Sequence, residues 1–303
     1  MNEKAILVTG SPRSGTTWVG RTIAKAPSVH YIHEPFNISR LPCHCGVRFD
    51  YWFYYVSSVN ESDFLEHLVH TIHPTINRIS LLNLIAELKA TKRIRPLRNY
   101  VRLLFKHRPL VKAPLAVFSA QWLAETFDMD VVIVIRHPAA VVNSYKTLKW
   151  QHPFSHFLKQ PALMAEHLAD FAVEITDFIQ NDYDIIDQTA MLWKLIHHMI
   201  LKYRQIKPEW IFVYHRDLSL DPIYGFQTIF DRMSLSFSDK VRRAIESYSA
   251  PINPIEAVNP YSTRRQSEQT IWSWKDQLTP EEICRIRRRV EPVSQAFFKE
   301  EDW

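Results

Sequence analysis

Three of the chain's five glycines lie between positions 10 and 20, and two of them frame the segment Gly10-Ser-Pro-Arg-Ser-Gly15. Two glycines at this spacing let backbone amides converge on an anion, and the dipole of a following helix favours negative charge there. The segment therefore predicts a phosphate-binding loop. The alternative is an unrelated turn that contains glycine.

The cation of this loop is unusual in type and position. The common nucleotide-triphosphatase loop carries lysine directly after its second glycine, but this chain has Thr16 there and Arg13 inside the loop. The apolar run 131–135 ends in Arg136, where a magnesium-dependent enzyme would carry an aspartate. These residues predict a site for a phosphate-like anion without a bound metal.

Arg136 begins a second candidate site. It follows the carboxyl end of a predicted buried strand, where ligands of open α/β sheets bind. Ser144 lies two turns into the next helix, on the same face as Val141 and Leu148. A polar residue in an apolar stripe needs a partner, which a second phosphate could supply. The alternative for Arg136 is a surface ion pair.

These residues need a scaffold of alternating strands and helices. Apolar runs predict strands near 4–9, 29–33, 109–112, 131–135 and 210–214. Helices are predicted at 17–26, 117–127, from Pro138, across 161–207, from Pro222 and from Thr279. This alternation predicts an α/β fold with a central parallel sheet of about five strands flanked by helices. We expect one domain over 1–303, with a largely helical insertion at about 56–107.

Composition excludes several classes of protein. A hydrophobic content of 46% excludes a disordered chain, and five glycines argue against a many-turned all-β fold. Three cysteines fit a reducing, cytoplasmic location, and Cys43-His44-Cys45 lacks the second pair of a zinc finger. No apolar run has the length of a membrane span, and the N-terminus lacks a signal-peptide core. We expect no metal and no nucleic-acid partner, and the oligomeric state stays open.

Two further stretches could contact a ligand. The formal charge is +5, and nine basic residues and no acidic one lie from Lys89 to Lys112. A helical stripe within this stretch could attract an anionic glycan or a membrane surface, or could be a solvated face; it comprises Arg95, Arg98, Arg102 and Lys106. The aromatic run 49–55 could line a ring-stacking cleft or belong to the core.

Together the motifs resemble those of one enzyme family. Ser-Pro-Arg-Ser-Gly-Thr-Thr-Trp at 11–18 resembles the phosphosulfate loop of sulfotransferases that use 3′-phosphoadenosine-5′-phosphosulfate (PAPS). Arg136 with Ser144 is similar to the pair that holds the 3′-phosphate in that family. Weaker similarities follow at Val111-Lys112-Ala-Pro114, at His215-Arg-Asp-Leu218 and at Arg264-Arg265 before Trp274-Lys275.

The candidate base departs from the aryl and steroid sulfotransferases. Those enzymes carry Lys-x-His, whereas this chain has Lys112-Ala113-Pro114. His33-Glu34-Pro35-Phe36 instead resembles the Glu-Pro segment of carbohydrate and several bacterial sulfotransferases. We therefore expect Glu34 to be the general base, with burial raising its pKa toward neutrality, and His33 to be the second candidate. The alternative for Glu34 is a structural ion pair or a helix cap.

The resemblance implies roles for the remaining residues. Arg13, Ser14, Gly15, Thr16 and Thr17 would hold the 5′-phosphosulfate, and Lys112 would neutralise charge on the transferred group. Trp18 would stack on adenine, or else belong to the core. The other nucleotide contacts would come from Arg136, Ser144, His215, Arg264 and Arg265. Two of these contacts are weakened by departures from the family pattern: histidine replaces tyrosine at 215, and Gln266 replaces a glycine.

The predicted reaction is in-line transfer of a sulfuryl group from PAPS to a hydroxyl of a carbohydrate or small metabolite. The second product would be adenosine 3′,5′-bisphosphate (PAP). Two alternatives come from other classes: a metal-dependent P-loop kinase and a non-catalytic protein that binds nucleotides or polyanions.

Overall fold

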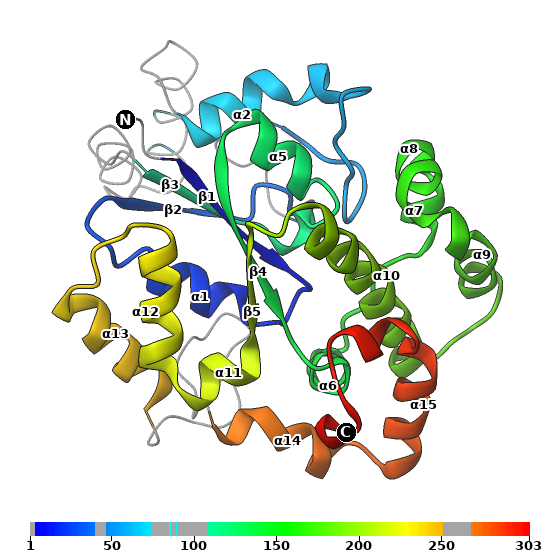
Figure 1. Ribbon diagram of the computed structural model, residues 1–303. Coiled ribbons are helices and arrows are strands. Elements are labelled where there is room, and N and C mark those ends of the chain that lie inside the picture. The colour runs from blue at the N-terminus through cyan, green and yellow to red at the C-terminus, as the bar shows by residue number, and fades with distance from the viewer. Residues whose placement is uncertain (1–3, 40–46, 74–84, 86–88, 90–107, 251–267) are drawn as a thin grey trace.

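A parallel sheet lies at the centre of the computed structural model, which describes residues 4–39, 47–73, 108–250 and 268–303 with positions 85 and 89 (Figure 1). Its five strands stand in the order β2-β3-β1-β4-β5. The strands are β1 (Ala5–Gly10), β2 (Val29–His33), β3 (Arg108–Lys112), β4 (Met129–Ile135) and β5 (Ile211–Tyr214). All four pairings are parallel. The predicted α/β class and the five predicted strands are confirmed.

The path of the chain through the sheet creates a crevice. From β1 the chain crosses to β2 at one edge, returns to β3, and then passes to the other side for β4 and β5. The direction of winding therefore reverses between β1 and β4. Connections leave these two strands toward opposite faces, so their carboxyl ends are open to a ligand.

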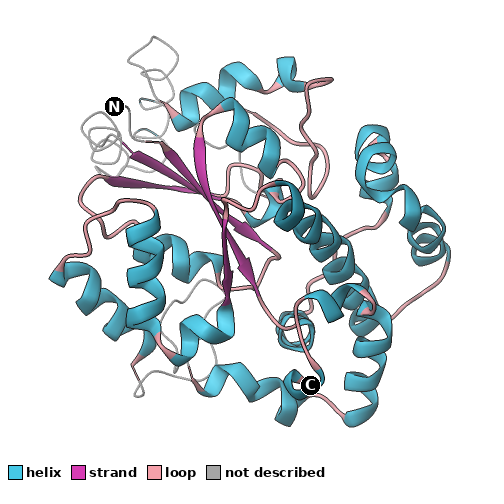
Figure 2. Ribbon diagram, in the orientation of Figure 1, coloured by secondary structure: helices cyan, strands magenta, loops and turns pink. Residues whose placement is uncertain are grey.

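Helices cover both faces of the sheet (Figure 2). They include α1 (Thr16–Ile23), α6 (Pro138–Leu148), α10 (Ile185–Ile206), α12 (Pro222–Arg232), α13 (Asp239–Ser249) and α15 (Pro280–Val290). The others include α2 (Leu65–Ile72), α5 (Ala120–Thr126), α7 (Ser155–Leu158), α8 (Pro161–Leu163), α9 (Ala172–Gln180), α11 (His215–Leu220) and α14 (Gln269–Gln277). The predicted starts at Pro138 and Pro222 are confirmed, and Thr279 and Glu282 form a capping box.

Alternation along β1 divides the core into two layers. Leu7 packs with residues of α5, α6 and α10, whereas Ile6 and Val8 pack with residues of α1, α12 and α13. Successive side chains of a strand point to opposite faces, so a strand covered on both sides is apolar at every position. Every residue from Ala5 to Gly10 is buried, which explains the continuous apolar run in the sequence.

The end of the basic stretch is buried in the sheet. The Arg108 Nε donates to the Lys4 carbonyl at 2.8 Å, and its guanidinium pairs with Asp130. Lys112 is 1% exposed, so these two cations do not extend a surface patch. The stripe from Arg95 to Lys106 and the segment Cys43-His44-Cys45 lie outside the described residues. Most of the predicted insertion does so too, and its extent stays a prediction.

The aromatic run belongs mainly to the core. Phe49, Phe53 and Tyr55 are buried, while Trp52 is half-buried. Its backbone is fixed by side chains that follow α6: the Trp52 amide donates to His156 Nδ1 at 3.0 Å, and the Tyr55 amide donates to Gln160 Oε1 at 2.8 Å. The alternative of core packing is therefore the one observed for the buried rings.

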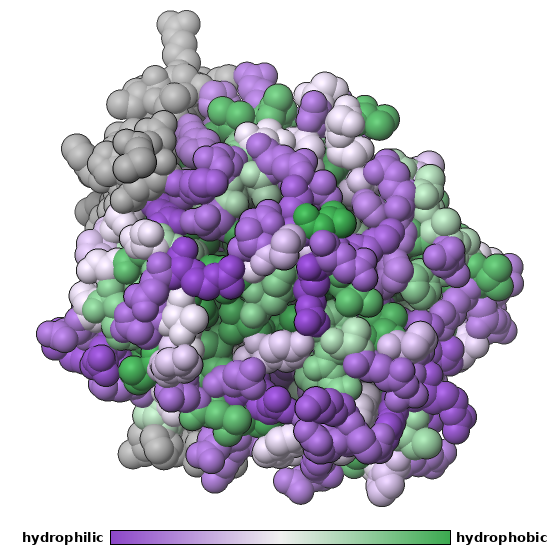
Figure 3. All heavy atoms as spheres, in the orientation of Figure 1, coloured by the Kyte–Doolittle hydropathy of each residue, from purple (hydrophilic) through white to green (hydrophobic). Residues whose placement is uncertain are grey.

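Hydrophilic side chains cover most of the face seen in Figure 3, with hydrophobic ones exposed near its centre. Scattered apolar exposure is normal for folded chains. None of the described helices combines the length and the hydropathy required to cross a membrane.

The start of the loop depends on a glycine that no other residue can replace. Gly10 has φ +138°, and a Cβ there would lie 2.4 Å from the Val134 carbonyl oxygen. We predict that Gly10→Ala lowers the free energy of unfolding by about 3 kcal/mol, because both the strain and the clash involve backbone. Urea denaturation measures this change.

Gly20→Ala is the matched control. Gly20 is helical, and a Cβ there would meet only side chains, at 3.0 Å from Tyr31 and 3.2 Å from Lys112. Helix propensity favours alanine by about 1 kcal/mol, so we expect a net change below about 1 kcal/mol. Equal losses in the two variants would contradict this account of Gly10.

Candidate active site

The carboxyl ends of all five strands carry predicted site residues. In sheet order these are Glu34 after β2, Lys112 ending β3, the loop after β1, Arg136 after β4 and His215 after β5. Neighbouring strands lie about 4.8 Å apart, and parallel strands end at the same edge. Segments distant in sequence therefore form one row along this edge.

The glycine loop has the geometry of an anion site. Arg13 and Gly15 both have positive φ, at 69° and 101°, and the Ser14 amide donates to the Ser11 carbonyl at 3.1 Å. Helix α1 begins at Thr16, directly after this turn. The hydroxyls of Ser11 and Ser14 are buried, and neither has a hydrogen-bond partner among the described residues. Buried donors at a helix N-terminus fit a phosphate group.

Arg13 joins the loop to the second predicted site. Its Nε donates to the Ser144 hydroxyl at 2.9 Å, and its carbonyl accepts from Arg136 Nη1 at 2.8 Å. The Arg136 carbonyl accepts from Trp193 Nε1 at 3.0 Å, which fixes this strand end from α10. Arg136 is only 8% exposed, so the alternative of a surface ion pair is wrong. The two predicted sites form a single hydrogen-bonded unit.

His215 lies against the loop and close to Trp18. A Cβ placed on Gly15 would be 2.7 Å from the His215 ring, so glycine is needed there for close packing as well as for its positive φ. The ring of Trp18 is buried, with centroids 5.9 Å from His215 and 5.3 Å from Phe226. The stacking of Trp18 on adenine stays a prediction.

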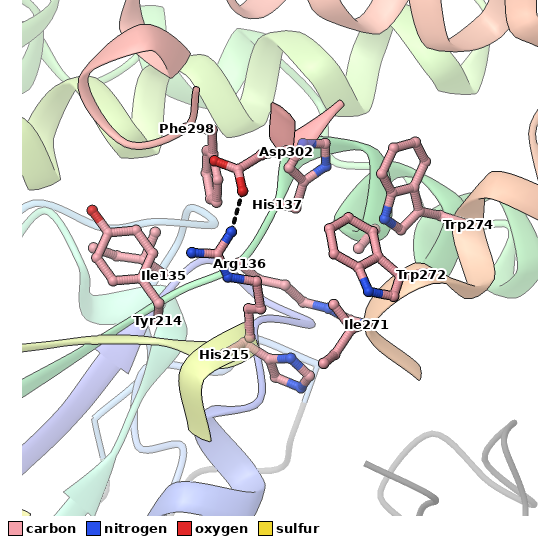
Figure 4. A pocket seen from close by; sticks show the side chains of 12 residues that line it. Ile135, Arg136, His137, Tyr214, His215, Ile271, Trp272, Trp274, Phe298 and Asp302 are labelled. Atoms are coloured by element: carbon pink, nitrogen blue, oxygen red, sulfur yellow. Dashed lines mark hydrogen bonds and ion pairs between the residues drawn. The ribbon is translucent and has the colours of Figure 1, made fainter. Parts of the chain in front are cut away.

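A small pocket lies beside Arg136 and His215, between the ends of β4 and β5 (Figure 4). Its aromatic walls come from α14 and from the C-terminal turns, and include Trp272, Trp274 and Phe298. His137 stacks on Trp274 at 4.8 Å, and burial lowers the pKa of His137 to about 3, so the imidazole is neutral at pH 7. The predicted contacts Arg264 and Arg265 lie outside the described residues.

Lys112 and Glu34 form a buried ion pair at the other end of the row. Their charged groups are in direct contact, and the side chains are 1% and 11% exposed. The Glu34 amide donates to the Lys112 carbonyl at 2.8 Å, and Asn37 Nδ2 donates to Glu34 Oε2 at 2.7 Å. Glu34 has φ 48°, an unusual conformation for a residue with a side chain. Such conformations concentrate at functional sites.

The ion pair makes Glu34 more acidic than the sequence predicted. Burial is the largest effect and raises the pKa of this carboxyl, but the Lys112 charge, its hydrogen bond and the Asn37 amide together hold the pKa below its ordinary value. The expectation that burial would raise it toward neutrality is therefore wrong for this arrangement. The alternative base His33 ends β2, where its Nδ1 lies 3.2 Å from the Tyr31 hydroxyl.

Three residues near the site were not singled out from the sequence. Asn37 binds Glu34, Ser11 adds a buried hydroxyl to the loop, and Trp150 lies over Arg13 with its ring centroid 5.5 Å from Cζ. The spacing of Ser11 between two glycines and of Asn37 three residues after Glu34 could have indicated them. Nothing in the local sequence marks Trp150.

Comparisons with known proteins identify the family and the fold of the chain. A sequence model of the sulfotransferase family matches residues 5–239. The sulfotransferase domain from the curacin biosynthetic pathway superposes with a TM-score of 0.52 at 12% identity, covering 99% of each chain. That of the Synechococcus PCC 7002 olefin synthase has a TM-score of 0.49 at 16% identity, covering 94% of this chain and 93% of its own. No curated protein matches the chain.

The family match covers more than half of the chain, so the chain belongs to the sulfotransferase family. It is a PAPS-dependent transferase that acts on an acceptor substrate. The curacin-pathway domain is only 12% identical, so its likeness is evidence for the fold alone. The superposition covers 99% of each chain and agrees with the α/β fold described above.

The ion pair predicts a specific pH dependence of stability. Because the folded-state pKa of Glu34 is lowered, the stability contributed by its charge is complete above about pH 4.3, the ordinary glutamate value, and is lost as pH falls through the folded pKa. Glu34→Gln leaves Lys112 buried without a counter-charge and should cost about 3 kcal/mol at pH 7. Urea denaturation should show this difference shrinking below about pH 4.

The double variant Glu34→Gln/Lys112→Met is the control, because it removes both charges. Its stability relative to wild type should exceed that of Glu34→Gln alone at pH 7. A difference between wild type and Glu34→Gln that stays constant down to pH 3 would show that the pair does not set the acidity of Glu34.

Proposed function

We propose that the chain transfers a sulfuryl group from PAPS to a hydroxyl of a carbohydrate or small metabolite, with Glu34 as general base and PAP as the second product. The observation that carries this proposal is the buried Lys112–Glu34 pair, which lies at the same sheet edge as the anion loop. A cation and a base side by side are the two groups that sulfuryl transfer to a hydroxyl requires.

The donor is bound along the central strands. The Ser14 amide donates to the Ser11 carbonyl within the loop, so the amides of Gly15 to Thr17 and the Arg13 guanidinium would hold the 5′-phosphosulfate. The buried hydroxyls of Ser11 and Ser14 support an anion there. Arg136 and Ser144 would hold the 3′-phosphate, which distinguishes PAPS from ATP. Trp18 and His215 would contact the nucleoside, and Arg264 with Arg265 would complete the site by resemblance to the family.

The basicity of Glu34 depends on two opposing effects, burial and the contact with Lys112. PAPS supplies an activated sulfuryl group, and the protein orients it and removes the acceptor proton. While Lys112 contacts Glu34, the carboxylate is a weak base. An anion that draws the Lys112 ammonium away removes the largest effect that opposes burial and leaves the hydrogen bond from Asn37. The pKa of Glu34 then rises, and the carboxylate accepts a proton more readily. Lys112 would in turn neutralise charge on the transferred group.

The acceptor class is supported by the Glu-Pro segment, which resembles carbohydrate and bacterial sulfotransferases rather than aryl and steroid ones. The cysteine count supports a cytoplasmic location. The rival kinase interpretation requires a loop lysine, which Thr16 replaces. A polyanion-binding protein would explain the basic stripe, but it would not explain the unit formed by Arg13, Arg136 and Ser144.

The direct test is an acceptor screen with ³⁵S-labelled PAPS and panels of sugars and small alcohols. We expect label transfer by wild type, and a loss of at least about 100-fold in Arg13→Ala because the loop loses its cation. Arg13→Ala should also weaken PAP binding in calorimetry. Arg243→Ala, an exposed arginine on α13, is the matched control and should leave both unchanged.

Calorimetry also separates the rival functions. We expect tight binding of PAP without magnesium and weak binding of ATP with or without it. Magnesium-dependent ATP binding would favour the kinase. Unchanged turnover in Arg13→Ala would overturn the assignment of the loop.

A second prediction concerns the base. Glu34→Gln should lower kcat by about 10²- to 10⁴-fold, with PAP affinity close to that of wild type, because Glu34 belongs to the acceptor side of the row. His33→Asn should change kcat by less than about 5-fold. The reverse pattern, with activity lost in His33→Asn and kept in Glu34→Gln, would assign the base to His33. Steady-state kinetics with the acceptor found in the screen make this measurement.

A further inference from the structure

Trp150 lies over the guanidinium of Arg13. Its ring centroid is 5.5 Å from Arg13 Cζ. The position is set by the end of α6, where Lys149 has φ 53° and the Trp150 amide donates to the Tyr145 carbonyl at 3.2 Å. This left-handed cap turns the chain back along the helix. The indole is thereby held beside the residue that links the two phosphate sites.

The contact complements the hydrogen bonds of Arg13. Its Nε donates to Ser144, and its carbonyl accepts from Arg136, so these bonds fix one end of the guanidinium and the backbone behind it. A planar, delocalised guanidinium can stack on an aromatic face while its N–H groups remain free to donate in its own plane. The indole therefore restricts the orientation of the group without using its hydrogen-bonding capacity.

Trp150 is itself supported by a series of aromatic side chains, of which Tyr145 is fully buried. Its ring packs edge-on against Tyr145 at 6.0 Å, and the Tyr145 hydroxyl lies 3.2 Å from His152 Nε2. His152 in turn packs at 4.9 Å against Trp52 of the aromatic run. Burial raises the pKa of Tyr145 and the Arg13 charge opposes that rise, which agrees with their proximity. Three rings, those of His152, Tyr145 and Trp150, therefore connect the aromatic run to Arg13.

We propose that Trp150 is a positioning residue that orients Arg13 for the 5′-phosphosulfate, a role that nothing in the loop motif assigns. The inference rests on the proposed function of Arg13 in binding the donor. It also accounts for an arginine rather than a lysine in the loop, since only the planar guanidinium can stack and present a fork of donors at once.

A double-mutant cycle tests this coupling. PAP affinity is measured by calorimetry for wild type, Trp150→Leu, Arg13→Ala and the double variant. We expect Trp150→Leu to weaken PAP binding about tenfold in the wild-type background, the scale of a partly desolvated cation–π contact, and to have little further effect once Arg13 is alanine. Trp150→Phe keeps an aromatic face and should restore most of the affinity, and Trp150→Met serves as a second ringless variant.

Phe237→Leu is the matched control, because Phe237 lies 5.7 Å from the Arg242 Cζ in the same kind of contact on another part of the molecule. It should leave PAP affinity unchanged. Equal losses from Trp150→Leu with and without Arg13, no loss at all, or unfolding of both ringless variants would each overturn the proposal. The cycle needs no acceptor, so a failure of sulfuryl transfer and a failure of this coupling are distinguishable.

Discussion

A wholly parallel sheet constrains where the chemistry of this chain can occur. Strands that run in one direction end at one edge, and the crossovers that join them place residues from Gly10 to His215 in a single row there. The reversal of winding between β1 and β4 opens this edge at its centre. The anion loop and Arg136 lie on the two sides of that opening, and Lys112 and Glu34 follow on the strands beyond β1. The order of the row is therefore the order of the strands.

The buried Lys112–Glu34 pair shows how the surroundings of a side chain set its pKa. A carboxylate taken out of water becomes a stronger base, while an adjacent ammonium makes it a weaker one. In Glu34 the second influence exceeds the first, helped by Asn37. Burying both charges is costly, and such pairs are weak evidence of stabilisation for its own sake. The proposed function gives a reason to retain this pair, because its ammonium would bind an incoming anion and its carboxylate would accept a proton.

Much of this arrangement could be predicted from the sequence. Apolar runs that end in Gly10 or Arg136 indicated buried strands, and the segment ending in His33 indicated a further strand. Because parallel strands end at the same edge of a sheet, the residues that follow them could be expected to lie together. The Lys112–Glu34 contact joins residues 78 positions apart, and no local pattern specifies that pairing, so the direction of the Glu34 pKa could not be predicted. The aromatic run was equally ambiguous, because apolar periodicity does not distinguish a core from a cleft. The aromatic run reaches Arg13 through Trp150, and the left-handed turn at Lys149 after α6 places Trp150 over Arg13.

The pocket beside Arg136 has a consequence for the synthesis of the protein. Its walls come from β4 and β5 and also from Trp272, Trp274, Phe298 and Asp302, which the ribosome produces after the whole sheet. Domains acquire structure from the N-terminus onward during translation, so the sheet edge and the loop can form well before these side chains emerge. A nascent chain would then expose the backbone around Arg136 and His137 to water until the closing residues arrive. The pocket beside Arg136 is therefore completed only after the sheet that carries it has been synthesised.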